Sequence, residues 1–208
     1  MTLVTRRTIL GTAAGFIAAS SLTFAGGAAK AETADMTIDE VLFDPDNPVL
    51  GNPDGDVTIV EYFDYQCPYC KANHPILTDV VENDGNIRLV MKDWPIFGAP
   101  SVTASQLALG AAKGGGYEKA SDALMATEGR LSDEIVRQTL SDAGFDPSAL
   151  EAAYKADRAK WDGLLGRNSK QASLMGLQGT PAFIIGTTIY PGAMDKAALL
   201  EAVALARA

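Results

Sequence analysis

The 208-residue sequence predicts an α/β fold: a β-α-β unit, then a long helical insertion, then a closing β-hairpin and helix. Two stretches carry most of this prediction. Residues 57–65 form an apolar run rich in β-forming residues, which is typical of a central strand buried on both faces. Residues 99–175 show a helical pattern instead. We therefore expect a sheet with helices on both faces and the insertion after the first β-α-β unit.

The only two cysteines, Cys67 and Cys70, lie three residues apart directly after the apolar run. Pro68 suits the first turn of a helix, where its missing N–H costs nothing, so Cys67 should open that helix. Unpaired N–H groups and the positive end of the helix dipole favour a thiolate there. Cys70 should be shielded one turn along. The pair can then alternate between dithiol and disulfide, with Cys67 as the sulfur that a partner reaches.

The segments around this motif complete the predicted fold. The first helix should cover residues 67–82 and bend at Pro75, and a turn at 83–86 should lead to a strand over 87–94. The parallel crossover should be right-handed. Five helices are expected in the insertion, over residues 101–113, 117–127, 132–142, 148–154 and 157–175. A hairpin and a helix should close the chain, over residues 182–185, 188–190 and 193–207.

Residues 1–31 resemble a cleavable export signal. They combine a basic start at Arg6 and Arg7, an apolar stretch over residues 9–24 and an A-x-A pattern at residues 29–31. The start also resembles a twin-arginine signal, so the export route stays open between that and the general secretory pathway. An uncleaved anchor is the alternative, although glycine, serine and threonine residues dilute the apolar stretch. We expect export to the periplasm, where a lone cysteine pair is exposed to oxidising conditions.

Removal of this signal takes away three basic residues and no acid, which changes the net charge from −9 to −12. That balance argues against nucleic acid or an anionic membrane surface as a partner. The remaining 177 residues suffice for one domain, which we expect over residues 56–208. Residues 32–55 should form an N-terminal arm laid over it, with a short element at 36–43 and an edge segment at 48–51. The arm is too short to be a dimerisation domain, so we expect a monomer.

Three segments resemble the DsbA-like thiol–disulfide oxidoreductases of the bacterial cell envelope, within the thioredoxin superfamily. They are V-E-Y-F-D-Y-Q-C-P-Y-C-K (Val60–Lys71), G-T-P-A-F-I-I-G (Gly179–Gly186) and P-G-A (Pro191–Ala193). The resemblance implies a thioredoxin fold with a helical insertion, a reactive first cysteine and a cis-proline facing it. Carried over to this chain, those residues are Cys67 and Pro181, with Thr180 before the proline.

Thr180 and Pro181 would then bind the substrate, because the Thr180 backbone could pair with an extended client segment beside the disulfide. The alternative is that the two residues merely begin an edge strand, where proline is tolerated. The chain departs from the family between the cysteines, where Pro68-Tyr69 replaces the Pro-His of the best-known strong oxidants. Tyr69 can give at most a neutral hydrogen bond, which predicts a less stabilised thiolate and a less oxidising disulfide.

Two ionisable residues are expected beneath Cys70, at positions where the family often has such groups. Glu61 lies on a face of the 57–65 strand where acids are rare unless paired. His74, the only histidine, lies four residues after Cys70 on the same helix face. Together they would form a relay for the proton of Cys70. Alternatively, Glu61 reaches solvent at the sheet end and His74 caps a hydrogen bond broken by Pro75.

The leading functional hypothesis is an envelope oxidase that donates the Cys67–Cys70 disulfide to reduced client proteins through a mixed disulfide on Cys67. A redox partner would then reset the pair. A disulfide isomerase or reductase is the first alternative, and a non-enzymatic Cu(I)-binding thiol module is the second. A purely structural disulfide would close almost no loop and stabilise little. No cofactor and no metal are expected, because a closed zinc site needs four ligands and only Cys67, Cys70 and His74 are candidates.

Overall fold

The computed structural model describes residues 36–208. The predicted export signal and its cleavage pattern lie outside the described residues. Within residues 36–208, no helix combines the length and the apolar composition needed to cross a membrane.

A five-stranded sheet forms the centre of the described chain, in the order β1-β3-β2-β4-β5. The middle strand β2 is parallel to β3 and antiparallel to β4, and both sheet edges are antiparallel. All but one of the β2 residues are buried, as its apolar run predicts. The strand bounds are β1 Val49–Gly51, β2 Val57–Phe63, β3 Ile87–Asp93, β4 Ala182–Ile185 and β5 Thr188–Pro191.

Eight helices accompany this sheet in the described residues, and five of them form the predicted insertion between β3 and β4. Their bounds are α1 Ile38–Leu42, α2 Pro68–Asp84, α3 Ala99–Ala112, α4 Tyr117–Met125, α5 Asp133–Asp142, α6 Pro147–Ala156, α7 Arg158–Leu174 and α8 Lys196–Ala206. Pro75 lies inside α2, as expected. The mixed α/β fold with a helical insertion is therefore confirmed.

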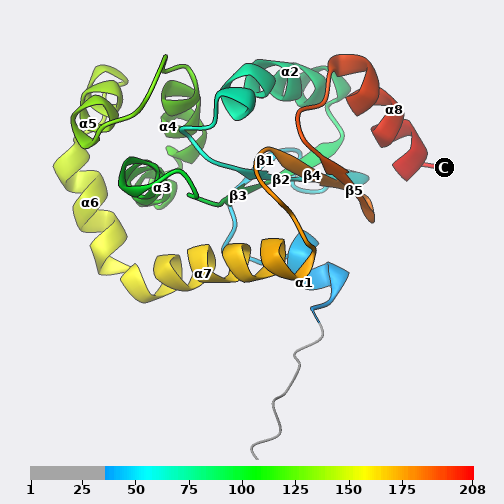
Figure 1. Cartoon of the computed structure of the whole chain (residues 1–208), viewed down its shortest axis with the longest axis horizontal. Helices are drawn as coiled ribbons and strands as arrows, with labels where there is room; N and C mark the ends of the chain where they lie inside the picture. The colour runs from blue at the N-terminus through cyan, green and yellow to red at the C-terminus, as the bar shows by residue number, and fades with distance from the viewer. Residues whose placement is uncertain (1–35) are drawn as a thin grey trace, which may run out of the picture. The chain divides into compact units, whose positions relative to one another are not determined.

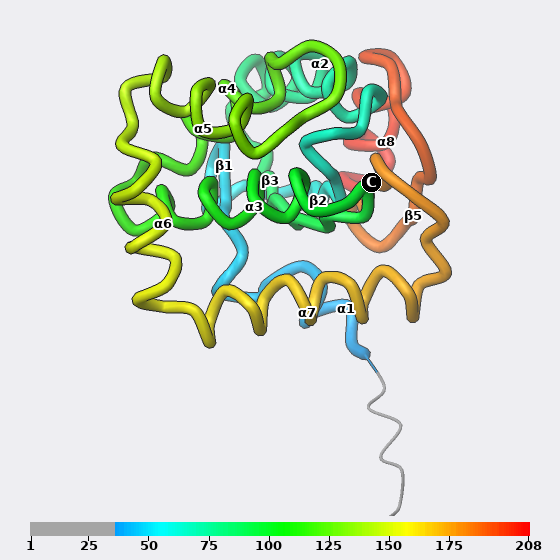
Figure 2. The backbone as a smooth tube through the Cα atoms, turned by 60° about the vertical axis from the view of Figure 1, so that its left-hand side comes forward, coloured from blue at the N-terminus to red at the C-terminus, as the bar shows by residue number. Residues whose placement is uncertain are grey.

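The helices form two layers on opposite faces of the sheet. Helices α2 and α8 cover one face, and α1 and α7 cover the other (Figure 1). Figure 2 shows α7 and α1 lying side by side along their face of the sheet. On the α2 face the apolar core continues into α3, α4, α5 and α6, so the insertion extends the core that surrounds the two cysteines.

The segment before β2 is tied closely to this fold. The Gln171 side chain of α7 donates to the Glu40 carbonyl at 3.0 Å, and Arg88 of β3 donates to the Leu42 carbonyl at 2.7 Å. Arg167 of α7 pairs with Asp44, with Nε and Oδ2 2.8 Å apart. This segment supplies both α1 and the edge strand β1, in the two places where the sequence predicts short elements.

A buried lysine lies between β3 and α7. The Lys92 Nζ donates to Gln171 Oε1 at 3.0 Å and to Asn168 Oδ1 at 3.4 Å. Tyr62 donates to the same Gln171 oxygen at 3.0 Å, and the Lys92 ammonium lies 5.7 Å from the Tyr62 ring centroid. Burial lowers the pKa of Lys92 to about 8. Its hydrogen bonds compensate for the loss of hydration and connect the insertion to the sheet.

Candidate active site

Cys67 occupies the N-cap position of α2, with φ −72° and ψ 118°, and Pro68 begins the helix. Cys70 lies on the first turn. Both cysteines are free thiols, and both are buried, with 1% of Cys67 and 0% of Cys70 exposed. Cys67 is thus nearly as buried as Cys70 in this structure, and which of the two sulfurs a partner reaches stays a prediction. The two thiols differ in their electrostatic surroundings rather than in exposed area.

Hydrogen bonding lowers the pKa of Cys67 to about 6. The Cys70 thiol is the largest contributor, and Thr180 and the backbone amides of Cys70 and Tyr69 add to it. The pKa of Cys70 is raised, first by burial, then by its hydrogen bond to Cys67 and by the nearby Glu61. At neutral pH, Cys67 is therefore a thiolate while Cys70 keeps its proton, so the nucleophile and the buried thiol are distinct.

Thr180 lies directly beside Cys67, and the Thr180–Pro181 peptide bond is cis. The Cys67 thiol contacts the Thr180 carbonyl oxygen at 3.2 Å. The Thr180 hydroxyl is buried and has no hydrogen-bond partner. When Cys67 is ionised, its sulfur can accept a hydrogen bond from that hydroxyl, which agrees with the contribution of Thr180 to the low pKa. The structure thus brings Cys67 together with Thr180 and the cis-Pro181 that follows it, as the family resemblance implies.

Glu61 is fully buried on β2, and neither carboxyl oxygen has a hydrogen-bond partner. The alternative that its side chain reaches solvent at the sheet end is therefore wrong. Burial, with a smaller contribution from the Cys67 charge, raises the pKa of Glu61 to about 8. The carboxyl group therefore holds a proton at neutral pH and lies close enough to raise the pKa of Cys70.

His74 is engaged away from this carboxyl group. Its Nε2 lies 2.8 Å from Asp122 Oδ1 of α4, and its Nδ1 is buried with no partner. Among the hydrogen bonds of the described residues, none joins His74 to Glu61 or Cys70. The structure therefore pairs His74 with Asp122 and leaves Glu61 without a hydrogen-bond partner, so the two members of the predicted relay are not joined by a hydrogen bond.

A second buried carboxyl group, Asp93 at the end of β3, was not anticipated from the sequence. Tyr117 of α4 donates to its Oδ2 at 2.7 Å, Tyr65 donates to the Tyr117 hydroxyl at 3.5 Å, and Asp93 Oδ1 has no partner. Burial raises the pKa of Asp93 to about 7. Asp93 lies two residues after Met91 on β3 and therefore points to the same side of the sheet, and Met91 lies beside Glu61, so both acids lie on one sheet face. The sequence signal that could have identified Asp93 is its position at the end of a largely apolar predicted strand.

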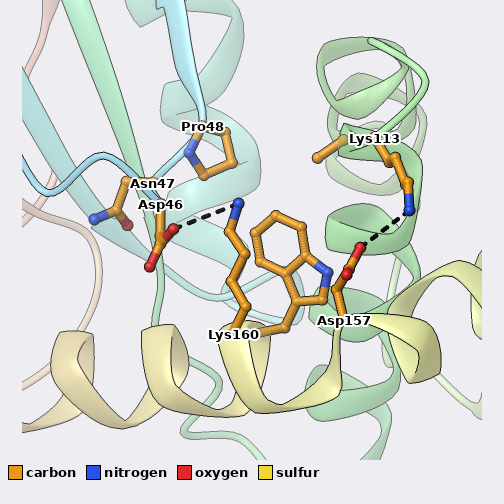
Figure 3. Close-up of a pocket in the computed structure, with 8 residues that line it drawn as sticks. Asp46, Asn47, Pro48, Lys113, Asp157 and Lys160 are labelled. Carbon is orange, nitrogen blue, oxygen red and sulfur yellow. Dashed lines mark hydrogen bonds and ion pairs between the residues drawn. The ribbon is translucent and has the colours of Figure 1, made fainter.

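Elsewhere, a cleft of about 240 Å³ lies between the segment before β1, the end of α3 and the start of α7. Figure 3 shows the Lys160 ammonium directed at Asp46, and Lys113 directed at Asp157. Both nitrogen–oxygen distances are 3.4 Å. No cysteine lines this cleft and its charges are internally paired, so we assign it no role. In residues 36–208, no cluster of three or more His, Cys, Asp or Glu side chains could hold a metal ion.

A thiolate beside a buried protonated thiol is the arrangement that thiol–disulfide exchange requires. The chain belongs to the thioredoxin family, whose sequence pattern matches residues 44–204. Its similarity to DsbA-like thiol–disulfide oxidoreductases is confirmed by the solved structures that it resembles.

Three of these structures show the extent of the similarity. A thioredoxin-like oxidoreductase from Silicibacter pomeroyi DSS-3 is 36% identical, covers 83% of this chain and 98% of its own, and has a TM-score of 0.79. The thiol-disulfide exchange protein alpha-DsbA2 from Wolbachia pipientis is 28% identical, with coverages of 80% and 90% and a TM-score of 0.75. A periplasmic thioredoxin-like protein from Salmonella enterica serovar Typhimurium is 29% identical, with coverages of 80% and 94% and a TM-score of 0.68.

The curated proteins with similar sequences are named as antiporters and not as oxidoreductases. A protein of Salinispora tropica called Na(+)/H(+) antiporter NhaA 3 is 27% identical over 163 residues, which make up 77% of this chain and 25% of that protein. The chain thus spans about a quarter of the length of the curated relatives that it matches. The name describes those longer proteins as a whole, and we carry no transport activity over to this chain.

Proposed function

We propose that this chain is an exported thiol–disulfide oxidoreductase that donates the Cys67–Cys70 disulfide to reduced client proteins. One observation carries the direction of transfer: the pKa of Cys67 is lowered to about 6. A stabilised thiolate stabilises the reduced form of the pair, which makes the Cys67–Cys70 disulfide more oxidising than one with an ordinary thiol pKa. The N-cap position and the hydrogen bonds to Cys67 supply this stabilisation even though Tyr69 replaces a histidine.

The proposed reaction has two exchange steps. A client thiolate attacks the Cys67 sulfur, a client–Cys67 disulfide forms, and the Cys67–Cys70 bond breaks with both of its electrons on the Cys70 sulfur. A second client thiolate then attacks the client sulfur of the mixed disulfide and releases Cys67 as a thiolate. The client gains a disulfide, the cysteine pair is reduced by two electrons, and a redox partner must reoxidise the pair.

Glu61 is proposed to donate a proton in the first step. The leaving Cys70 sulfur is buried, where a thiolate is poorly stabilised. The Glu61 carboxyl group is protonated at neutral pH because its pKa is raised to about 8. Transfer of that proton to Cys70 leaves a neutral thiol and a carboxylate that can later equilibrate with solvent. We keep Glu61 in the relay and omit His74, because the His74 ring is paired with Asp122.

Location in the periplasm remains part of the proposal. It is supported by the signal-like residues 1–31 and by the similarity to a periplasmic thioredoxin-like protein. The monomeric state is likewise a prediction, and light scattering of the mature protein tests it.

The mechanism is tested with two single-cysteine variants. Cys70→Ser should accumulate mixed disulfides with oxidised client proteins: its Cys67 thiolate attacks a client disulfide, one client sulfur leaves as a thiolate, and no Cys70 thiol remains to resolve the client–Cys67 bond. Cys67→Ser should accumulate few, because the pKa of its remaining thiol, Cys70, is raised by burial and the thiol keeps its proton. Non-reducing electrophoresis after acid quenching measures both. Covalent clients on Cys67→Ser alone would show that the assignment of the two sulfurs is reversed.

The direction of transfer is tested by the reduction potential, measured in glutathione buffers. An oxidase should lie well above the potential of thioredoxin, which is about −270 mV. A value at or below that of thioredoxin, together with a mainly reduced pair in cells, would favour the reductase or isomerase alternative.

A further inference from the structure

Gln66, the residue before Cys67, joins two loops that lie far from it in the sequence. Its Nε2 donates to the Phe97 carbonyl at 2.7 Å, in the loop between β3 and α3. Its Oε1 accepts from the Leu131 N–H at 3.0 Å, in the loop between α4 and α5. One end of the amide donates and the other accepts, so a carboxylate of the same shape could satisfy only the second partner.

Asp64 holds the β3–α3 loop through a second set of hydrogen bonds. Its buried Oδ2 accepts from the Ile96 N–H at 2.7 Å and from the Phe97 N–H at 3.0 Å, and its Oδ1 accepts from the Gln66 N–H at 2.7 Å. Phe97 is thus held at both its N–H and its carbonyl by two residues of the turn that leads into α2. The backbone of this loop is fixed relative to Cys67.

The side chains on this fixed backbone are apolar and exposed. Ile96 is 41% exposed and Phe97 47%, and Tyr69, between the two cysteines, is 68% exposed. Large apolar side chains exposed on segments that are hydrogen-bonded to the turn before Cys67 offer a contact surface. Because their backbone is already ordered, a partner would bind them with little loss of conformational entropy.

We propose that Gln66 is a positioning residue that holds Ile96 and Phe97 in place to contact an apolar side chain next to the reactive cysteine of a client. This inference rests on the proposed function, because it concerns which polypeptides reach Cys67. Gln66 does not touch the reacting sulfurs in this proposal. It determines how strongly an apolar neighbour in the client accelerates exchange.

The test uses two synthetic peptides that each contain one cysteine, flanked by leucine in one and by serine in the other. Each reduced peptide reacts with the oxidised protein: its thiolate attacks the Cys67 sulfur, and the Cys70 sulfur leaves and is protonated. The ratio of the two second-order rate constants measures apolar selectivity. We expect the leucine peptide to react about tenfold faster with the parent, as burial of a few methylene groups allows.

Gln66→Ala and Gln66→Glu should reduce this ratio to about twofold, and Phe97→Ser should do the same with both Gln66 hydrogen bonds intact. Leu205→Ser is the matched control, because Leu205 is 65% exposed on α8. Its neighbour Arg207 pairs with Asp84, at the opposite end of the 17-residue α2 from Cys67. We expect Leu205→Ser to keep the parental ratio.

A double-mutant cycle separates positioning from a general structural role. Gln66→Ala should change the ratio by less than about twofold in the Phe97→Ser background, because the two changes remove one effect. An unchanged ratio in Gln66→Ala, or an equal fall of both rates, would overturn the inference while leaving the proposed function intact. Failure of the parent to react with either peptide would overturn both. Should Gln66→Ala not fold, as judged by circular dichroism, Gln66→Glu and Phe97→Ser decide the question.

Discussion

The two faces of the sheet differ in whether their buried ionisable side chains have hydrogen-bond partners. On the α7 face, Lys92 donates to two side-chain oxygens and lies against an aromatic ring. On the α2 face, Glu61 has two unpartnered oxygens and Asp93 has one. Both regions are equally inaccessible to water, since all three side chains are 0% exposed. The faces therefore differ in how completely hydrogen bonds compensate for burial.

This difference in hydrogen bonding indicates a structural role for Lys92 and a candidate functional role for Glu61 and Asp93. Buried polar groups in folded proteins are nearly always hydrogen-bonded, and an unpaired one destabilises the fold. The acids with unpartnered oxygens lie on the face that carries the cysteines, where a carboxyl group with a raised pKa can exchange a proton. The paired lysine lies on the face where α7 and α1 must be attached. We expect changes on the first face to alter the chemistry of the cysteines as well as stability, and changes on the second to alter stability alone.

The largest expected effect is the pH dependence of stability that Glu61 produces. Its pKa is raised from 4.5 to about 8, so between these values the folded protein holds a proton that the unfolded chain has released. The stability associated with this proton is complete below about pH 4.5 and is lost as the pH rises to about 8, at up to ~1.4 kcal/mol per pH unit. We expect Glu61→Gln to remove this slope and to raise the free energy of unfolding at pH 8 by ~2–4 kcal/mol.

Urea unfolding at pH 5, 6, 7 and 8 measures this effect in the Cys67→Ser/Cys70→Ser background. That background is needed because the Cys67 pKa is lowered in the fold, so its contribution to stability rises with pH and has the opposite sign. Burial, the main cause of the Glu61 shift, is retained there. Parallel stability profiles with and without Glu61 would show that the carboxyl group titrates normally and would remove it from the proposed relay.

An intermediate effect is expected on the other face. Lys92→Met keeps an unbranched apolar chain in the same place, but Asn168 and Gln171 lose their donor. We expect the free energy of unfolding to fall by ~1–3 kcal/mol, the usual cost of buried acceptors without a partner. The rate of Cys67 alkylation should stay at the parental value, because Lys92 lies across the sheet from the cysteines. A changed alkylation rate at full stability would contradict the division of roles between the faces.

The fold was predictable because its signals are local. The apolar run over residues 57–65, the cysteine–proline start of α2 and the helical periodicity each depend on neighbours in the sequence. The observed helix boundaries differ from the predicted ones where a capping residue fixes the end of the helix. Helix α2 continues to Asp84 because Gly85, with φ 70°, ends it, and α8 begins after Asp195, whose side chain accepts from the Ala198 N–H.

The candidate site was predictable only in part, because its electrostatics depend on contacts between distant segments. The pairing of His74 with Asp122 joins α2 to α4 across 48 positions, and the contacts of Gln66 span 31 and 65 positions. No local pattern specifies such partners. The resemblance to a known family located Cys67, Thr180 and Pro181 together, since it carries information about distant contacts that residue spacing lacks.

The smallest expected effect concerns the Thr180 hydroxyl, which like Glu61 is buried without a partner. Thr180→Val removes this donor and keeps the shape of the side chain, so the Cys67 thiolate loses one stabilising hydrogen bond. We expect the pKa of Cys67 to rise by about half to one unit, a difference of ~0.7–1.4 kcal/mol. Thr180→Ser is the matched control, because it retains a hydroxyl and should keep the pKa of Cys67 at about 6. The pH dependence of alkylation measures both variants.

The reduction potential of the Cys67–Cys70 pair should fall by up to about 30 mV in Thr180→Val, because a less stabilised Cys67 thiolate makes the disulfide less oxidising. An equal rise in both variants would show that packing around Thr180, and not its hydroxyl, sets the Cys67 pKa.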